Sequence, residues 1–261
     1  MEGYPRVELM TVIGGSGGAG ATTLVAYLAP ALVRFDRKVV AIDADLGMGN
    51  LGEMLGTRAQ LGVGDVISGR STFREAMLTA WEGVRIVAAG AYPDPMRSLG
   101  PCEEIRLLEQ IDAIAPEVDI VVVDAGRTPN MCFLAAVADR IVLVATPCRA
   151  MRRKAAETLK VVMAGRRRKT PVHILVNRSR SPEDGVRTFA EIAGLMDHTL
   201  CRELHFLGSF PFDAGLERWV QVPPDAPERV GIVTAAKAMA AKLVGSTLDP
   251  PPADRWGVFS V

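Results

Sequence analysis

The sequence predicts a doubly wound, mostly parallel α/β sheet flanked by helices. Short apolar runs alternate along the chain with segments whose apolar residues recur at helical spacing. A glycine-rich loop separates the first run from the first helical segment, and two later runs end in aspartate. Open sheets of this class carry their chemistry at the carboxyl ends of the strands, so the same observations predict where the functional site lies.

Length and composition favour one large domain. The chain has 261 residues, 49% of them hydrophobic, which suffices for one α/β core but is short for two. We expect a single domain over residues 1–248 and a proline-rich tail over residues 249–261. The formal net charge is zero, so affinity for nucleic acid or an anionic membrane has to come from a local patch.

Cysteine usage and the lack of long apolar runs indicate a cytoplasmic protein. The four cysteines are far apart and form no C-x-x-C pair, which argues against a zinc site and a disulfide scaffold. No uninterrupted apolar run reaches the roughly 18 residues of a membrane span. The first ten residues also lack the apolar stretch of an export signal. We therefore expect no transmembrane segment.

The first apolar run, over residues 7–13, leads into the glycine-rich loop. Gly15 and Gly20 have the spacing of the P-loop, G-x-x-x-x-G-K-[ST], with Thr22 as the hydroxyl on the magnesium side and Ala21 at the lysine position. Glycine is needed because backbone N–H groups must point inward at φ values that a side chain obstructs. A flexible turn between strand and helix is the alternative. The predicted phosphate-binding residues are Gly15, Ser16, Gly17, Gly18, Ala19, Gly20, Ala21, Thr22 and Thr23.

The next two predicted elements are a helix and a strand, and the strand ends in the first pair of carboxylates. A helix is predicted over residues 22–35, and Pro30 within it predicts a kink or two shorter helices. A second strand over residues 38–42 ends in Asp43-Ala44-Asp45. The two aspartates either belong to a site at this strand end or cap the following helix through their carboxylates.

The middle of the chain ends in another strand closed by an aspartate. The pattern predicts a helix near residues 72–80, a strand over 84–88, a surface loop over 92–101 and a helix over 102–114. Residues 118–124 form the most strand-like segment of the chain, and Asp124 closes it. This is the Walker B pattern, in which the carboxylate holds magnesium through a water. Arg127, in the next loop, either brings a positive charge near the phosphates or faces solvent.

The second half of the sequence predicts two strands with a helix between them, and a final helix. Strands are expected over residues 139–146 and 172–176, with a helix over 150–164 between them and Asn177 directly after the second strand. Residues 232–244 carry one apolar side, which favours packing on the sheet over membrane binding because the helix has only two lysines and no bulky aromatic residue. That side is formed by Ile232, Ala236, Met239, Ala240 and Leu243.

A basic segment covers residues 149–180. It contains eleven lysines and arginines against one acid, Glu157. Such a segment can bind a nucleic-acid backbone, anionic lipid or an acidic partner. A solvated helix face is the simpler interpretation, because no aromatic residues are interleaved for stacking on bases.

The loop resembles the deviant Walker A motif of the MinD/ParA family, K-G-G-x-G-K-[ST]. The matching residues are Ser16-Gly17-Gly18-Ala19-Gly20-Ala21-Thr22, so both family lysines are absent: Ser16 replaces the lysine that reaches across the dimer, and Ala21 replaces the P-loop lysine. The segment DADLGMGNLGEMLG over residues 43–56 resembles switch I of the family's flagellar-number branch, FlhG. By that resemblance Asp45 orients the attacking water, Asp43 serves the magnesium shell together with Thr22 and Asp124, and Asn50 lies near the phosphates.

The resemblance extends to the nucleotide base. Asn177 matches the position where the family reads the adenine edge, and LGSFPFDAGL resembles the segment that closes the other side of the base. Its implied contact residues are Pro211, Phe212 and Asp213.

The resemblance implies an ATP- or ADP-binding protein with Mg²⁺ that controls the placement or number of a polar organelle such as the flagellum. It implies an ATP-dependent homodimer, weak or absent hydrolysis, protein partners at a cell pole, and a location in the cytoplasm or peripherally at the membrane or pole. The alternative is a non-hydrolysing scaffold similar to CpaE and TadZ, which positions a pilus or polar complex. An iron–sulfur carrier of the related Mrp type is disfavoured because its C-x-x-C pair is missing.

Overall fold

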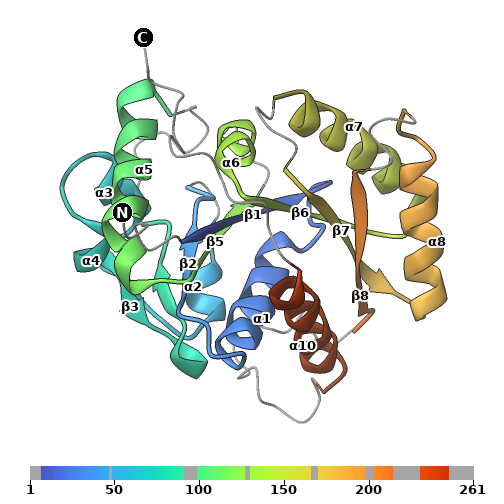
Figure 1. The fold of residues 1–261 in the computed structure, drawn as a ribbon, viewed down its shortest axis with the longest axis horizontal. Helices are drawn as coiled ribbons and strands as arrows, with labels where there is room; N and C mark the ends of the chain where they lie inside the picture. The colour runs from blue at the N-terminus through green and yellow to red at the C-terminus, as the bar shows by residue number, and fades with distance from the viewer. Residues whose placement is uncertain are drawn as a thin grey trace, which may run out of the picture.

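A computed structural model describes residues 7–46, 49–90, 99–126, 130–165, 170–197, 203–213 and 230–246. Its centre is an eight-stranded sheet with the order β3-β4-β2-β5-β1-β6-β7-β8 (Figure 1). All neighbouring strands are parallel except β3 and β4. The strands are β1 (Glu8–Gly14), β2 (Val39–Asp43), β3 (Leu78–Thr79), β4 (Arg85–Val87), β5 (Ile120–Gly126), β6 (Arg140–Ala145), β7 (Val172–Ser179) and β8 (Leu204–Pro211).

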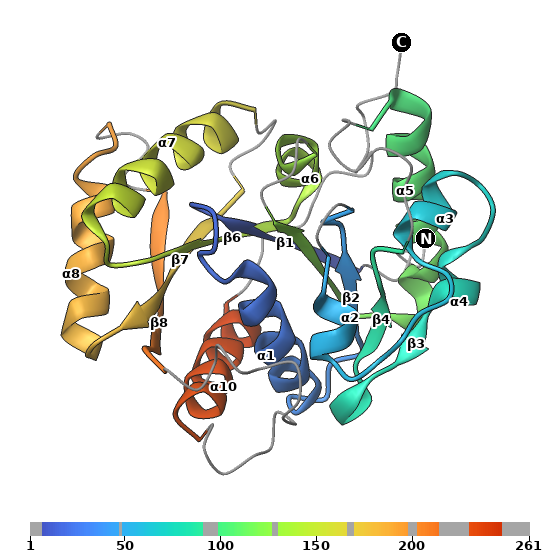
Figure 2. The same cartoon turned by 180° about the vertical axis from the view of Figure 1, so that it is seen from behind.

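Helices cover both faces of the sheet, so the predicted doubly wound, mostly parallel α/β fold is confirmed (Figures 1 and 2). Alternate residues of β1 divide the core: Leu9 and Ile13 face one hydrophobic cluster, and Met10 and Val12 face the other. The described helices are α1 (Ala21–Val33), α2 (Leu51–Met54), α3 (Val63–Ile67), α4 (Phe73–Ala76), α5 (Pro101–Ile114), α6 (Met131–Val137), α7 (Arg149–Gly165), α8 (Pro182–Ala193) and α10 (Val230–Gly245), with short 3₁₀ turns η1 (Trp81–Gly83) and η2 (Ala115–Glu117).

The first helix is continuous through Pro30. The expectation of two shorter helices is therefore wrong: α1 runs unbroken from Ala21 to Val33. Proline removes one backbone hydrogen bond, but α1 is buried from Leu24 to Leu32, and this packing stabilises the helix more than its intrinsic propensity does.

Two other boundaries differ from the predicted ones. The helix expected near residues 72–80 ends at Ala76, because Leu78 pairs antiparallel with Ile86 and starts β3 at the sheet edge. Strand β7 continues to Ser179, so Asn177 lies within the strand and not after it. The extension is stabilised by pairing with β8, where Ser179 is the register partner of Pro211.

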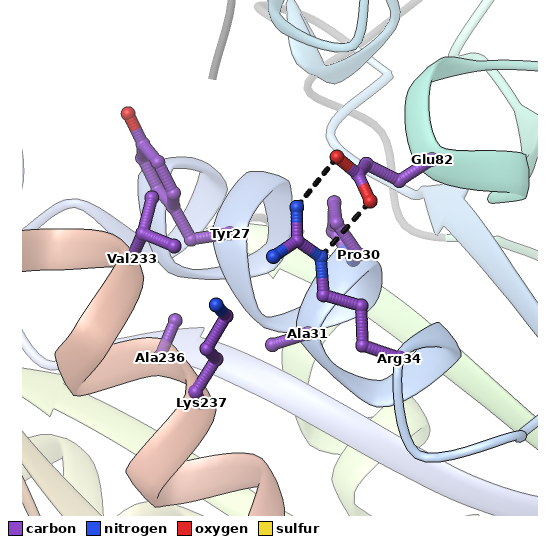
Figure 3. A pocket seen from close by; sticks show the side chains of 8 residues that line it. All are labelled: Tyr27, Pro30, Ala31, Arg34, Glu82, Val233, Ala236 and Lys237. Carbon is purple, nitrogen blue, oxygen red and sulfur yellow. Dashed lines mark hydrogen bonds and ion pairs between the residues drawn. The ribbon is translucent and has the colours of Figure 1, made fainter. Parts of the chain in front are cut away.

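The C-terminal helix packs as predicted. The five residues of its expected apolar side are its buried residues, and α10 contacts α1 and β8. A small pocket of about 40 Å³ lies between α1 and α10. Figure 3 shows its lining side chains, among which Arg34 pairs with Glu82. The proline-rich tail and most of the loop expected over residues 92–101 lie outside the described residues. Among the described helices, none combines the length and the apolar character needed to cross a membrane.

Candidate functional site

The two glycines that the spacing singled out are the ones that packing requires. Gly15 donates its N–H to the Val144 carbonyl (2.9 Å), and a Cβ there would lie 2.9 Å from the Ala155 Cβ. Gly20 has φ +95, and a Cβ there would lie 2.3 Å from the Asn177 Nδ2. The loop is thus held against β6, α7 and β7, which argues against a loose turn.

The loop opens directly into the N-terminus of α1. The first N–H bonded back into the helix is that of Leu24, which donates to the Gly20 carbonyl (2.9 Å), so the N–H groups of Ala21, Thr22 and Thr23 have no partner within the helix. Gly20 provides no side-chain cap. Unpaired N–H groups and the helix dipole together favour an anion here.

The positions of the two absent lysines are both buried. Ser16 is 2% exposed and Ala21 is 7% exposed, with the Ala21 methyl group in the hydrophobic cluster beneath the loop. Neither side chain carries a charge. Any cation that stabilises a bound phosphate must therefore come from another element.

Two buried carboxylates face each other at the ends of neighbouring strands. Asp43 ends β2, Asp124 lies near the end of β5, and the two are register partners with 1% and 0% exposure. The Asp124 Oδ1 accepts a hydrogen bond from the Gly126 N–H (3.1 Å), while its buried Oδ2 has no hydrogen-bond partner among the described residues. An unsatisfied buried carboxylate oxygen is costly, and its position indicates a ligand.

Electrostatics supports a cation between these strands. Burial, and then repulsion by Asp124, raises the pKa of Asp43 to about 8 against the opposing N–H groups of Leu51 and Asp45. Burial raises the pKa of Asp124 to about 6, although hydrogen bonds from Thr22 and Gly126 lower it in part. A divalent cation would relieve both penalties.

The donor set fits Mg²⁺ better than a metal held by protein ligands alone. Thr22, Asp43 and Asp124 offer hard oxygen atoms, and no group of three or more His, Cys, Asp and Glu side chains gathers among the described residues. Mg²⁺ usually takes one or two carboxylates and completes its shell with water and substrate phosphate.

The Asp43 carboxylate also caps the following helix, the alternative role that its position in the sequence predicts. Its Oδ2 accepts the N–H of Leu51, the first residue of α2 (3.0 Å), and its Oδ1 accepts the N–H of Asp45 (3.2 Å). The carboxylate that caps α2 is also one of the two that face each other at the strand ends, so a cation bound there would be coupled to α2. Asn50 is exposed and is the N-cap residue of α2, without a side-chain capping bond.

Asp45 reaches toward β5. A Cβ on Gly126, which has φ +52, would lie 2.7 Å from the Asp45 Oδ2. Repulsion by Asp45 also contributes to the raised pKa of Asp43 and of Asp124, so the Asp45 carboxylate interacts electrostatically with the other two. Arg127 lies outside the described residues.

Asn177 holds the loop. Its Nδ2 donates to the Ala19 carbonyl (2.9 Å), its Oδ1 accepts the Arg178 N–H (2.8 Å), and the residue is 4% exposed. Asn177 therefore fixes the loop to the end of β7 and is not an ordinary turn residue. Beyond it, Phe212 donates its N–H to the Ser179 carbonyl (2.8 Å), which sets the end of β8 beside Asn177. Pro211 and Phe212 are exposed, Phe212 by 61%, and Asp213 is half-buried.

A cavity of about 770 Å³ opens beside the loop. This volume lies in the range of small-molecule sites, about 300–1,000 Å³. The sequence did not predict most of the residues that line it, although the carboxyl end of β6, next to β1, is a position where sheets of this class bind ligands. The lining residues are Ser16, Gly17, Gly18, Thr146, Pro147, Cys148, Met151, Arg152, Arg178, Arg180, Ser181, Glu183, Asp184, Arg187 and Phe212.

The structure divides the basic segment. Arg152, Arg178 and Arg180 line the cavity. The exposed basic residues of α7 lie on the solvent-facing side of that helix. Residues 166–169 lie outside the described residues. Binding of nucleic acid or anionic membrane by residues 149–180 stays a prediction.

Known proteins with similar sequences and structures show which family the chain belongs to. The chain is 30% identical over 255 residues to the antiactivator FleN of Pseudomonas aeruginosa, covering 96% of this chain and 90% of FleN. It is 22% identical to the flagellum site-determining protein YlxH of Helicobacter pylori, covering 83% of this chain and 74% of YlxH. The structure superposes with a TM-score of 0.68 on the septum site-determining protein MinD complexed with Mg-ADP from Pyrococcus horikoshii, at 23% identity and 92% and 98% coverage.

The family model describing the CobQ/CobB/MinD/ParA nucleotide-binding domain matches residues 10–222, a range that contains the glycine-rich loop, the three carboxylates and Asn177. This chain therefore belongs to the CobQ/CobB/MinD/ParA family of nucleotide-binding domains.

Proposed function

We propose that this chain is an ATP-binding spatial regulator of the MinD/ParA type, similar to FlhG, that controls the placement or number of the flagellum. The name of the relative YlxH supports the flagellum as the target. The observation that carries the nucleotide part is the juxtaposition of an uncapped glycine-rich loop with two buried carboxylates, one of which has an unsatisfied oxygen. The proposed domain spans residues 1–248, with residues 249–261 as a tail.

In this proposal the loop from Gly15 to Thr23 binds the phosphates through backbone N–H groups, whereas the N–H groups of Gly15 and Ala19 hold the loop in place through the Val144 and Ser16 carbonyls. Thr22, Asp43 and Asp124 hold Mg²⁺, which neutralises phosphate charge when bound. Asp45 orients the attacking water, while Asn177, Pro211, Phe212 and Asp213 contact the base. Base binding at Asn177 requires its amide to exchange its present bond to Ala19 for one to the ligand.

Hydrolysis is weak or absent in this proposal because both lysines are missing. Each lost charge-assisted bond weakens binding by about 1.5–3 kcal/mol, but the loop amides remain. Ser16 cannot reach a partner's phosphate as a lysine can, so the ATP-dependent homodimer is expected to be weaker as well. Such a regulator acts through protein partners at the cell pole, from the cytoplasm or peripherally at the membrane.

The test is titration calorimetry with ATP and ADP, with and without Mg²⁺. We expect wild-type protein to bind ATP weakly and to gain affinity with Mg²⁺, and Asp124→Asn to lose the gain from Mg²⁺. The control Asp119→Asn changes a carboxylate at the opposite end of β5, one that accepts the Lys38 N–H, and should keep that gain. No binding by wild-type protein at millimolar ATP would contradict the proposal.

A second candidate is a non-hydrolysing scaffold, similar to CpaE and TadZ, that positions a pilus or polar complex through protein contacts alone. Its support is the buried alanine at the lysine position. A scaffold should dimerise and bind partners equally well after Asp124→Asn, whereas a nucleotide-dependent regulator should not. Sedimentation of both proteins with and without Mg-ATP separates the two.

A further inference from the structure

Arg178 has a backbone conformation that needs an explanation. Its φ is +58, in the left-handed region that residues with a side chain rarely adopt. Of the described non-glycine residues with positive φ, Asp36 and Glu82 lie in turns, and Arg178 alone lies within a strand. Strain of this kind persists where the surroundings enforce it, and it concentrates at functional sites.

A bulge between β7 and β8 enforces this conformation. Val176 pairs with Ser209 and Ser179 pairs with Pro211, so that two residues of β7, Asn177 and Arg178, lie opposite one residue of β8. Bulges re-aim side chains that strict alternation would place elsewhere. Here Asn177 is buried against the glycine-rich loop, and Arg178 is exposed and lines the cavity.

The other arginines of the cavity are engaged. Arg152 pairs with Glu191 (2.8 Å) and donates to the Pro147 carbonyl (2.7 Å), and Arg187 pairs with Asp184. Arg180 also interacts electrostatically with Asp184. Within the described part of the chain, the Arg178 guanidinium makes no hydrogen bond or ion pair.

Arg178 is also next to the loop. Asn177, its neighbour, donates to Ala19 and lies against Gly20, while Gly17 and Gly18 form part of the same cavity wall as Arg178. Gly17 and Gly18 have no neighbouring atoms within 4 Å of an added Cβ, so this side of the loop is open to a ligand.

We propose that Arg178 supplies the cation that Ser16 and Ala21 lack, and that it binds the phosphate oxygens of a nucleoside di- or triphosphate seated on the loop. This inference rests on the proposed nucleotide-binding function. The guanidinium suits the task because its planar fork pairs with two phosphate oxygens at once and stays charged. The bulge and the left-handed backbone place the positive charge at the end of β7, whereas the family lysines place it on the loop.

The test compares binding of adenosine, ADP and ATP by wild-type protein, Arg178→Gly, Arg178→Lys and a control, Arg153→Ala. Glycine removes the guanidinium and accepts positive φ, so Arg178→Gly should be at least as thermally stable as wild type without nucleotide. Arg153 is an exposed arginine of α7 outside the cavity lining, and its removal changes the net charge equally.

We expect Arg178→Gly to bind ATP about ten- to a hundredfold more weakly, with a smaller loss for ADP and none for adenosine. Arg178→Lys should keep part of the affinity, and Arg153→Ala should match wild type. Equal ATP affinity for Arg178→Gly and wild type, or an equal loss for ATP and adenosine, would overturn the inference while leaving the proposed function standing. Absence of ATP binding by wild-type protein would instead overturn the proposed function and this inference with it.

Phosphate also occurs in lipid headgroups. A second experiment, vesicle binding, distinguishes a nucleotide from a lipid as the source of the phosphate. Vesicles of phosphatidylglycerol should bind wild-type protein and Arg178→Gly equally. Loss of vesicle binding by Arg178→Gly with unchanged ATP affinity would overturn the nucleotide assignment in favour of a membrane contact.

Discussion

Two clusters of buried charged residues lie at opposite ends of the parallel strands, and their polar atoms are hydrogen-bonded to different degrees. Arg140, at the start of β6, is 1% exposed and donates to the Glu8 carboxylate (2.8 Å), the Ser246 hydroxyl (2.7 Å) and the Leu243 carbonyl (3.4 Å). Asp124, near the end of β5, keeps a buried oxygen without a partner among the described residues. The first cluster ties strands to α10, whereas the second is left with capacity for a ligand.

The largest effect should follow from breaking the satisfied cluster. Arg140→Ala removes a buried cation that joins β1, β6 and the end of α10, and we expect the free energy of unfolding to fall by about 3–5 kcal/mol. Urea denaturation measures the loss. The control Arg74→Ala breaks the exposed pair with Glu117 and should cost less than about 1 kcal/mol. Equal losses in the two variants would mean that the Arg140 cluster is not what holds α10.

Removing a charge from the cluster of Asp43 and Asp124 should have the opposite effect and raise the free energy of unfolding. The folded-state pKa of Asp43 is raised to about 8, so its ionisation lowers stability as pH rises from about 4 through 8. Asp43→Asn should therefore raise the free energy of unfolding without ligand, by about 1–4 kcal/mol at pH 9 and by less at pH 6. The same variant should lose the gain in ATP affinity from Mg²⁺. A variant that is less stable than wild type at pH 9 would show that the carboxylate is structural.

A smaller, pH-dependent effect should come from His173, beside Arg140. Burial, followed by repulsion from Arg140 and His205, lowers the pKa of His173 to about 3. The unfolded chain then binds more protons than the folded one between pH 6.5 and 3, so this residue lowers stability as pH falls through that range. At pH 5.5 we expect His173→Gln to regain up to about 1 kcal/mol relative to wild type, and nothing at pH 7.5. A difference that does not change with pH would contradict the assignment.

The sequence predicted the half of the site that rests on local geometry. Spacing alone predicts Gly15 and Gly20, because the P-loop has glycines where the loop backbone packs closely against neighbouring elements. Asp43 and Asp124 each close a predicted strand, and in the sheet the two strand ends are register partners. The apolar side of α10 followed from helical periodicity.

The remaining features of the fold and the site depend on tertiary contacts that the periodicity of the sequence does not encode. The bulge at Asn177 and Arg178 arises from pairing with β8, and nothing local marks it. Arg140 belongs to no basic segment in the sequence, and its burial comes from Glu8 and Ser246, both more than a hundred residues away. The Asp43 cap of α2 could be stated only as one of two alternatives, since one carboxylate can serve either purpose.

In the proposed function the phosphate-binding loop, the magnesium-binding carboxylates and the water-orienting Asp45 are intact, and the missing lysine limits turnover. The most direct measurement is the ATPase rate of Ala21→Lys. One added charge that follows the developing phosphate charge is worth about 3–4 kcal/mol, so we expect turnover to rise about a hundred- to a thousandfold above wild type, and Asp45→Ala in that variant to remove the gain. Turnover that stays at background in Ala21→Lys, and that Asp45→Ala leaves unchanged, would contradict the account.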